Sequence, residues 1–156
     1  MKRTKLLTAC LAALSLAACG QSAPKVAAGP SAVGVFTSGP DCAASGKLQL
    51  DDCNALLQRA IQSHQQSATK YISLRLCEEA EGVDRCERAD TNAFRRGLLA
   101  FQVTFSTPPV AIPLYAPADK AVIGFTTLDK SKTLLAVDEM LIFSQDAKTV
   151  ALGSIN

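Results

Sequence analysis

Four cysteines between residues 42 and 86, placed around one amphipathic helix, constrain the fold of this chain more than any other feature. Their successive spacings of 11, 24 and 9 residues do not form the paired C-x₂₋₄-C units that surround zinc, and no C-x-x-C redox motif occurs. An even set of this kind is typical of two disulfides in an oxidising compartment. We therefore expect a structural role, with no metal and no cofactor, for Cys42, Cys53, Cys77 and Cys86.

Four cysteines allow three pairings, and we favour the one that closes two short local loops. Cys42–Cys53 and Cys77–Cys86 would each close a loop beside a helix, and each would contribute ~2–3 kcal/mol by constraining the unfolded chain. The nested pairing, Cys42–Cys86 with Cys53–Cys77, would instead join two antiparallel helices. The spacing alone leaves this alternative open.

The amphipathic helix is predicted over residues 51–66. From Cys53 to His64, apolar positions recur at i, i+3, i+4, i+7, i+8 and i+11, which is the period of one helix face. Asp51 and Asp52 suit the first turn, because carboxylates there meet unpaired N–H groups and the positive end of the helix dipole. Cys53 is therefore expected to point into the core from the first turn.

A second, shorter helix is predicted from residue 73 to residue 82. Ser73 is placed to cap its start, and Gly82 can take the left-handed conformation that ends a helix. The mixed-charge run that follows, up to residue 97, is expected to be a solvated surface helix or loop. Arg95 and Arg96 within it could touch phosphate or lipid headgroups, but a lone pair of arginines is more often part of a solvated face.

The second half of the chain has the alternation that is typical of strands. Residues 101–106 predict a half-buried strand, and residues 110–114 a second one that Pro113 would confine to a sheet edge. Residues 32–36 are expected to add a short strand, ended by a turn at 38–41. Short apolar runs separated by polar turns then predict an antiparallel meander over residues 121–127, 133–137, 140–143 and 149–152.

These patterns predict an α+β fold in which a disulfide-stapled helical segment packs on a small antiparallel β-meander. The apolar spacing over residues 134–141 would also fit a helix, which is the alternative for that stretch. We expect one domain over residues 32–156, with a Cys-rich, mainly helical part at 32–97 and a mainly β part at 98–156.

The first 18 residues have the pattern of a secretory signal peptide. A basic start precedes an apolar run that is too short for a bilayer, which needs about 20 apolar residues. The run ends Leu16-Ala17-Ala18-Cys19, which resembles the lipobox of bacterial lipoproteins. By that resemblance, cleavage leaves Cys19 as a lipidated N-terminus with a diacylglycerol and an amide-linked acyl chain such as palmitate. An ordinary secretory signal is the alternative.

Residues 19–31 are predicted to be the lipidated cysteine and a flexible tether, because small residues and proline dominate and no apolar period occurs. Two or three acyl chains anchor a protein stably, so the membrane itself is an expected partner. Gly20 and Gln21 stand where an aspartate would retain a lipoprotein at the inner membrane by the common Gram-negative sorting rule. We therefore expect the outer membrane, with the domain facing the periplasm.

The charge of the processed chain argues against a nucleic-acid partner. The sequence has 16 Lys and Arg against 14 Asp and Glu, but residues 1–18 contain three of the basic residues and none of the acidic ones. Subtracting 3 from 16 leaves 13 basic against 14 acidic residues, a net charge of −1. Such a chain has no basic field to attract a polyanion.

No catalytic constellation is visible in the sequence, so we predict that the protein is not an enzyme. There is no P-loop, H-E-x-x-H, G-x-G-x-x-G or G-x-S-x-G. His64 is the only histidine, and it continues the apolar stripe to a point where its ring could cap the core and leave a nitrogen in water. His64→Gln should then change stability by within about 1 kcal/mol and leave function intact. Tyr71 and Tyr115 are expected to be core or rim residues.

Short motifs spread over roughly residues 1–90 resemble one family. They are Val35-Phe36 ahead of Asp41-Cys42, Cys53 at the start of an Ala/Leu-rich helix, Lys70-Tyr71, Cys77-Glu78 and Gly82-x-x-x-Cys86. Together they resemble the YgiB-like bacterial lipoproteins, a family of unknown function from Gram-negative envelopes. The resemblance implies an envelope location and brings no catalytic residues.

Three functions then compete. The first, which we favour, is a membrane-anchored interaction or structural protein that docks other envelope proteins. The second is a small-ligand-binding lipoprotein, and the third is an enzyme with an unrecognised site. Exposed apolar surface without a pocket would favour the first, whereas a deep apolar cleft with a few convergent polar groups would favour the second.

Overall fold

The computed structural model describes residues 32–153 of the chain. The predicted signal peptide, Cys19 and the predicted tether lie outside the described residues. Within residues 32–153, no helix combines the length and the apolar character that a membrane crossing requires.

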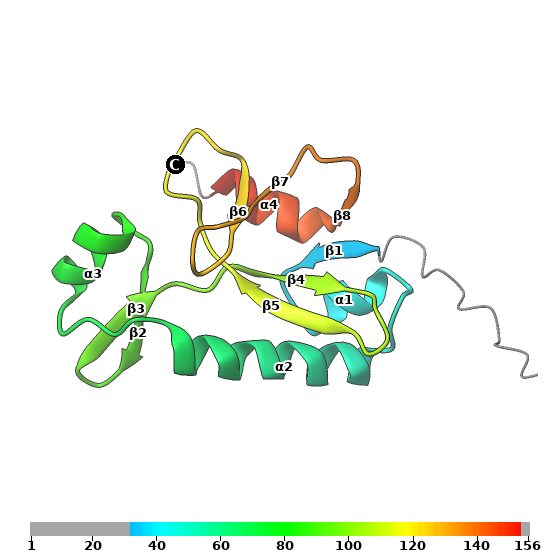
Figure 1. Cartoon of the computed structure of the whole chain (residues 1–156), viewed down its shortest axis with the longest axis horizontal. Helices are drawn as coiled ribbons and strands as arrows, with labels where there is room; N and C mark the ends of the chain where they lie inside the picture. The colour runs from blue at the N-terminus through cyan, green and yellow to red at the C-terminus, as the bar shows by residue number, and fades with distance from the viewer. Residues whose placement is uncertain (1–31, 154–156) are drawn as a thin grey trace, which may run out of the picture.

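A four-stranded sheet in the order β5-β4-β1-β8 forms the middle of the fold (Figure 1). At its centre β1 (Val33–Phe36) pairs antiparallel with β4 (Ala100–Thr104) and parallel with β8 (Leu141–Phe143). The outer strand β5 (Val110–Leu114) pairs antiparallel with β4 and carries Pro113, so the predicted edge position of this strand is confirmed. A proline is tolerated there because an edge strand can spare an N–H group.

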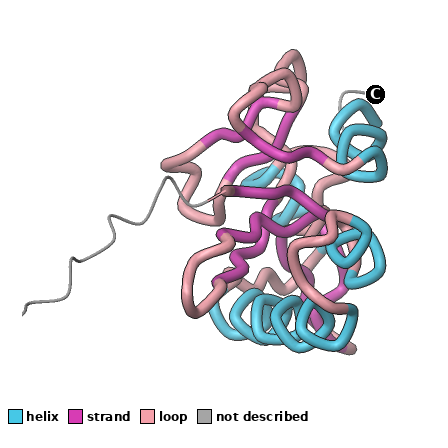
Figure 2. The backbone as a smooth tube through the Cα atoms, turned by 90° about the vertical axis from the view of Figure 1, so that its right-hand side faces the viewer, coloured by secondary structure: helices cyan, strands magenta, loops and turns pink. Residues whose placement is uncertain are grey.

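Both faces of this sheet are covered (Figure 2). The helices α1 (Gly39–Ala44) and α2 (Leu50–Ser67) lie on one face, where Phe36 and Phe101 pack against α2. The helix α4 (Gln145–Gly153) lies on the other. Because neighbouring strand residues point to opposite faces, each central strand supplies both cores, and β4 is more deeply buried than the predicted half-buried strand.

The long helix α2 agrees with the predicted range to within one residue at each end. Asp51 and Asp52 lie in its first turn, as expected, although Gln49 precedes the helix without a side-chain cap. The buried positions all belong to the predicted stripe, namely Cys53, Leu56, Leu57, Ala60 and His64, whereas Ile61 of that stripe is half-buried.

Two local predictions around the first helices need correction. The predicted turn at 38–41 instead starts α1: Ser38 Oγ accepts from Asp41 N at 3.2 Å, and Pro40 lies in the first turn, where its missing N–H costs nothing. The helix α3 (Leu74–Glu81) is capped by Ser73 as predicted. Gly82 ends it with φ 110° and ψ 153°, a positive φ outside the left-handed helical region.

The mixed-charge run after α3 is a β-hairpin, so the predicted solvated helix or loop is wrong. Strands β2 (Cys86–Asp90) and β3 (Ala93–Arg96) pair antiparallel, and Glu87 lies directly opposite Arg95. Charges spaced along the chain thus meet across two strands rather than along one helix face. Figure 1 shows this hairpin and α3 together at one end of α2.

The C-terminal part departs from a simple meander. Strands β6 (Gly124–Thr126) and β7 (Thr133–Leu135) form the expected antiparallel hairpin, but β8 crosses over to pair parallel with β1. The predicted strand 149–152 belongs to α4, because Ser144 Oγ accepts from Ala147 N at the start of this helix. The α+β class is confirmed.

Candidate functional site

His64 lies inside a polar cluster rather than at the edge of the core. Its side chain is 1% exposed; Nδ1 is 2.8 Å from the hydroxyl oxygen of Tyr115, and Nε2 is 3.0 Å from Oε1 of Glu87. Because a carboxylate can only accept, Nε2–H donates to Glu87; in the tautomer that carries its proton on Nε2, Nδ1 accepts from the hydroxyl of Tyr115. The expectation that one ring nitrogen would reach water is therefore wrong.

Glu87 is the acceptor that joins His64 to the hairpin. Arg95 Nε donates to Oε1 over 2.7 Å, and the backbone N–H of Leu98 donates to Oε2 over 3.2 Å. Burial alone would raise the pKa of Glu87, but hydrogen bonds from His64, Arg95 and Leu98 outweigh it and hold that pKa below its usual value. Glu87 is consequently a carboxylate at neutral pH with its oxygens already bonded.

Tyr115 is a core residue, one of the two outcomes expected for it. Its side chain is fully buried, and this burial raises the pKa of its hydroxyl to about 12. The guanidinium of Arg96 lies over the ring, 4.8 Å from its centroid, in a cation–π contact. The hydroxyl therefore stays protonated and available to His64.

A second branch of the cluster centres on Glu81 at the end of α3. Tyr71, a half-buried rim residue, donates its hydroxyl to Oε1 over 2.8 Å, and Lys130 Nζ lies 3.2 Å from Oε2. Burial alone would raise the pKa of Glu81, but hydrogen bonds from Tyr71 and Lys130 bring it below its usual value. Burial, followed by this hydrogen bond, raises the pKa of Tyr71.

Arg95 and Arg96 do not form the expected solvated face. Their side chains are 12% and 3% exposed. Arg96 Nη2 donates to the carbonyl of Ala116 over 2.6 Å, while its Nε has no hydrogen-bond partner among the described residues and lies 3.7 Å from Oε2 of Glu81. Burial lowers the pKa of Arg96, and Glu81 opposes that effect.

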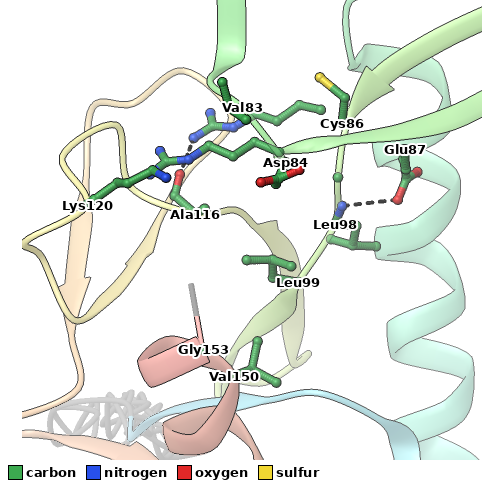
Figure 3. Close-up of a pocket in the computed structure, with 13 residues that line it drawn as sticks. Val83, Asp84, Cys86, Glu87, Leu98, Leu99, Ala116, Lys120, Val150 and Gly153 are labelled. Carbon is green, nitrogen blue, oxygen red and sulfur yellow. Dashed lines mark hydrogen bonds between the residues drawn. The ribbon is translucent and has the colours of Figure 1, made fainter. Parts of the chain in front are cut away.

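A cavity of about 520 Å³ lies beside this cluster. Figure 3 shows Val83 and Asp84 on one side of it, Val150 and Gly153 of α4 on the other, and Leu99 between them. The lining is thus assembled from the start of the hairpin, the entry to β4 and the last helix. Its apolar members include Val83, Leu98, Leu99, Ala116 and Val150, and its charged members are Asp84, Arg85, Glu87, Arg96 and Lys120.

Arg85 is the least expected member of this lining. It is 8% exposed, and its Nη1 has no hydrogen-bond partner among the described residues. Its stem lies over Gly82, where a Cβ would come within 2.7 Å of Arg85 Cδ. Its charge also lowers the pKa of Arg96, so two like charges lie close together. Burying a guanidinium without a counter-charge is costly, and packing alone does not explain it.

The four cysteines form two disulfides in the structure. Cys42–Cys53 joins α1 to α2, and Cys77–Cys86 joins α3 to β2; this is the pairing that closes the two short loops. Cys77–Cys86 also fixes the first residue of the hairpin that carries Glu87. In the part of the chain that the structure describes, no group of three or more His, Cys, Asp or Glu side chains is placed to hold a metal ion.

Sequence reasoning singled out His64 and the cysteines but missed the partners that define the site. Glu87 and Tyr115 stand 23 and 51 residues from His64, and no local period connects them. No sequence pattern marks Arg85 as a binding residue, because its burial depends on the chain folding back over it. The only local signal is Gly82, three residues earlier, which leaves room for the stem.

Residues 30–106 match the sequence model of a family described as a protein of unknown function (DUF1190). The matched stretch holds the four disulfide-bonded cysteines together with His64, Arg85, Glu87 and Arg96, and it ends shortly after β4. No curated protein and no solved structure matches the chain. The match agrees with the resemblance to YgiB-like lipoproteins seen in the sequence.

Proposed function

We propose, from the premise that the chain belongs to the DUF1190 family of unknown function, that it is a lipid-anchored bacterial envelope protein that binds a small ligand. The observation that carries this proposal is the cavity between the hairpin and α4. Its volume of about 520 Å³ falls within the ~300–1,000 Å³ of small-molecule sites. An apolar lining with a few convergent charged groups is the feature that favours a ligand-binding role over a purely structural one.

The location rests on two independent features. Two disulfides indicate an oxidising compartment outside the cytoplasm. The lipobox-like run before Cys19 supports anchoring by acyl chains, and the residues after it support the outer membrane. A domain held at the membrane surface and facing the periplasm would meet ligands released from, or travelling between, the envelope layers.

A non-enzymatic role is supported by the state of the candidate chemical groups. His64 has both ring nitrogens bonded within the protein and is shielded from water. A general acid or base must reach the proton that it transfers, and His64 itself does not line the cavity, although its partner Glu87 does. Cys42, Cys53, Cys77 and Cys86 are joined in disulfides, so none of these four supplies a thiolate.

Docking of another envelope protein is the second candidate. It is supported by exposed apolar side chains in the segment between β7 and β8, where Val137 is 77% and Met140 is 83% exposed. Exposed apolar groups of this kind mark interaction sites in many proteins. Because the structure has a cavity of suitable volume, we favour ligand binding over this role.

The ligand-binding role can be tested with the neutral fluorophore N-phenyl-1-naphthylamine. The protein would be the mature chain from residue 19 with Cys19→Ser, exported behind a cleavable secretory signal, so that only the lipid is missing. We expect the probe to brighten on binding. Leu99→Trp and Val150→Phe should fill the cavity and weaken binding by about tenfold or more, equivalent to ~1.4 kcal/mol. Leu135→Trp, at an exposed site outside the cavity, is the matched control.

Absence of probe binding to the unsubstituted chain, or equal binding by the cavity-filling variants while they remain folded, contradicts the proposal. Anchoring is tested separately in cells by Cys19→Ser in the full chain. That variant should stay unprocessed or leave the membrane fraction. If it matures and sediments with membranes as the unsubstituted protein does, the lipobox interpretation is wrong.

A further inference from the structure

Arg85 is a buried cation that has no protein partner among the described residues. A guanidinium carries five N–H donors and no acceptor, so it requires oxygen atoms around it. The side chain is 8% exposed, Nη1 is enclosed without a hydrogen bond, and no described carboxylate lies within ion-pair distance of it. Arginine is almost never buried to this extent unless it is paired.

The half-buried carboxylates near Arg85 bind other groups of the protein. Glu87 accepts from His64, Arg95 and the Leu98 backbone. Glu81 accepts from Tyr71 and forms ion pairs with Lys130 and Arg96. Asp84 is the remaining acid of the lining, and it is exposed to solvent. Arg85 is therefore a buried cation of the lining that no described carboxylate approaches to ion-pair distance.

A second buried guanidinium, that of Arg96, lines the same cavity. Its Nε has no hydrogen bond among the described residues but lies 3.7 Å from Oε2 of Glu81, so Arg96 already has a counter-charge in the protein. Lys120 adds a solvent-exposed cation to the lining. Two buried guanidinium groups and one exposed ammonium thus surround a single space, an arrangement that attracts an anion.

The backbone around Arg85 determines where its side chain lies. Gly82 holds φ at 110°, which L side chains rarely adopt, and its missing Cβ leaves the space in which the Arg85 stem lies. The Cys77–Cys86 disulfide fixes the neighbouring residue of the same strand start. The guanidinium is held in place before any ligand arrives, which lowers the entropic cost of binding.

The rest of the lining indicates what the ligand carries besides its anionic group. Leu98, Leu99 and Val150 offer an apolar wall beside the two arginines. Both carboxylate and phosphate match the planar fork of a guanidinium, with two parallel N–H···O bonds. A ligand that fits both parts has one anionic group and a short apolar chain.

We propose that the cavity binds a small anionic amphiphile, whose carboxylate or phosphate group pairs with Arg85 while its alkyl chain lies against Leu99 and Val150. This inference rests on the proposed function, since it requires that the cavity takes up a ligand. It adds the chemical class of that ligand and the residues that select it.

The test compares chain-matched competitors for bound N-phenyl-1-naphthylamine in the non-lipidated mature chain at neutral pH. The competitors are octanoate, octyl phosphate and octanol. At least one of the anions should displace the probe about ten- to a hundredfold more effectively than octanol, because it gains charge-assisted hydrogen bonds. Arg85→Met should abolish this preference and leave the effect of octanol unchanged. Arg88→Met, which removes an exposed guanidinium of the same hairpin, should retain it.

Stability provides a second readout for Arg85. If Arg85 only packed against its neighbours, its replacement would destabilise the protein. If it is an unpaired buried charge, its replacement should not. The midpoint of thermal unfolding of Arg85→Met without ligand should equal or exceed that of the unsubstituted chain. Octanoate or octyl phosphate should raise the midpoint of the unsubstituted chain only.

Two sources of the anion are distinguished by flotation with phosphatidylglycerol vesicles and phosphatidylcholine vesicles. Arg85-dependent binding to the first alone assigns a lipid headgroup as the source, and displacement by octanoate without vesicle binding assigns a free acid. Equal displacement by octanol and both anions, unchanged by Arg85→Met, overturns the anionic ligand but leaves the ligand-binding function standing. A chain that takes up neither the fluorophore nor any competitor overturns both.

Discussion

The Nδ1 atom of His64 on α2 and the hydroxyl oxygen of Tyr115 after β5 lie 2.8 Å apart, with both side chains almost completely excluded from water. This hydrogen bond joins the family-matched part of the chain to the C-terminal part. Through Glu87 it continues to Arg95 and the hairpin that borders the cavity. The cluster therefore holds together the elements from which the cavity is formed.

Removing the Tyr115 hydroxyl should destabilise the protein while preserving the packing of its ring. Tyr115→Phe leaves a buried nitrogen of His64 without a partner, which costs ~1–3 kcal/mol of unfolding free energy. Urea unfolding followed by circular dichroism measures this change. Tyr71→Phe is the control and should cost less, because Tyr71 is half-buried and Glu81 keeps Lys130 as a partner. Equal losses in the two variants would contradict the buried bond.

His64→Gln should now cost more than the change of within about 1 kcal/mol expected for a boundary residue. A glutamine side chain cannot reproduce both the bond to Tyr115 and the bond to Glu87 in the ring's geometry, so we expect a loss of ~1–3 kcal/mol. The same urea experiment tests it. Cellular function should persist wherever the variant is folded and membrane-bound. A folded, localised variant without function would contradict a purely structural role for the ring.

Stability should fall in acid as Glu81 and Glu87 become protonated. Their pKa values in the folded protein lie below the ordinary value of 4.5, so the unfolded chain binds protons first. Their contribution is therefore complete above about pH 4.5 and is lost as the pH falls through the folded values. Unfolding free energies measured from pH 7 to pH 3 should show this decline. Glu87→Gln should be less stable at pH 7 and decline less steeply, whereas exposed Glu79→Gln should follow the unsubstituted profile.

The two disulfides should contribute differently to the free energy of unfolding. Each should contribute ~2–3 kcal/mol through its short loop. Cys42 and Cys53 are both fully buried, whereas only Cys77 of the second pair is, so replacing the first pair with alanine leaves the larger cavity. The Cys42→Ala/Cys53→Ala protein should thus be less stable than the Cys77→Ala/Cys86→Ala protein. Non-reducing peptide mapping should recover only these two pairs. Recovery of Cys42–Cys86 or Cys53–Cys77 would contradict the pairing.

Periodic segments of the sequence were sufficient to predict several elements. The range of α2 and the burial of Cys53 follow from a 3.6-residue stripe, which any solvent-facing helix must show when one face is buried. Pro113 placed β5 at an edge because it lacks a backbone donor. The α+β class followed from the order of these segments along the chain.

Short segments were decided by the tertiary structure. Residues 149–152 have the composition of a strand, yet Ser144 caps a helix there and Ala147 and Ala151 pack into the core. The hairpin of residues 86–96 forms from charges that looked equally suited to a helix, because its pairing depends on a partner strand rather than on a local period. In segments of this length, local preferences are weak and burial against distant elements outweighs them.

The sequence by itself determined the residues that close disulfides near a helix, the amphipathic face of that helix and the candidate lipid anchor, because each depends on neighbours along the chain. Only the tertiary structure decided that Glu87 and Tyr115 would enclose His64 and that Arg85 would lie buried in the wall of a cavity. Such contacts join elements far apart in sequence. Their formation depends on how the sheet is covered on both faces, a property of the whole fold.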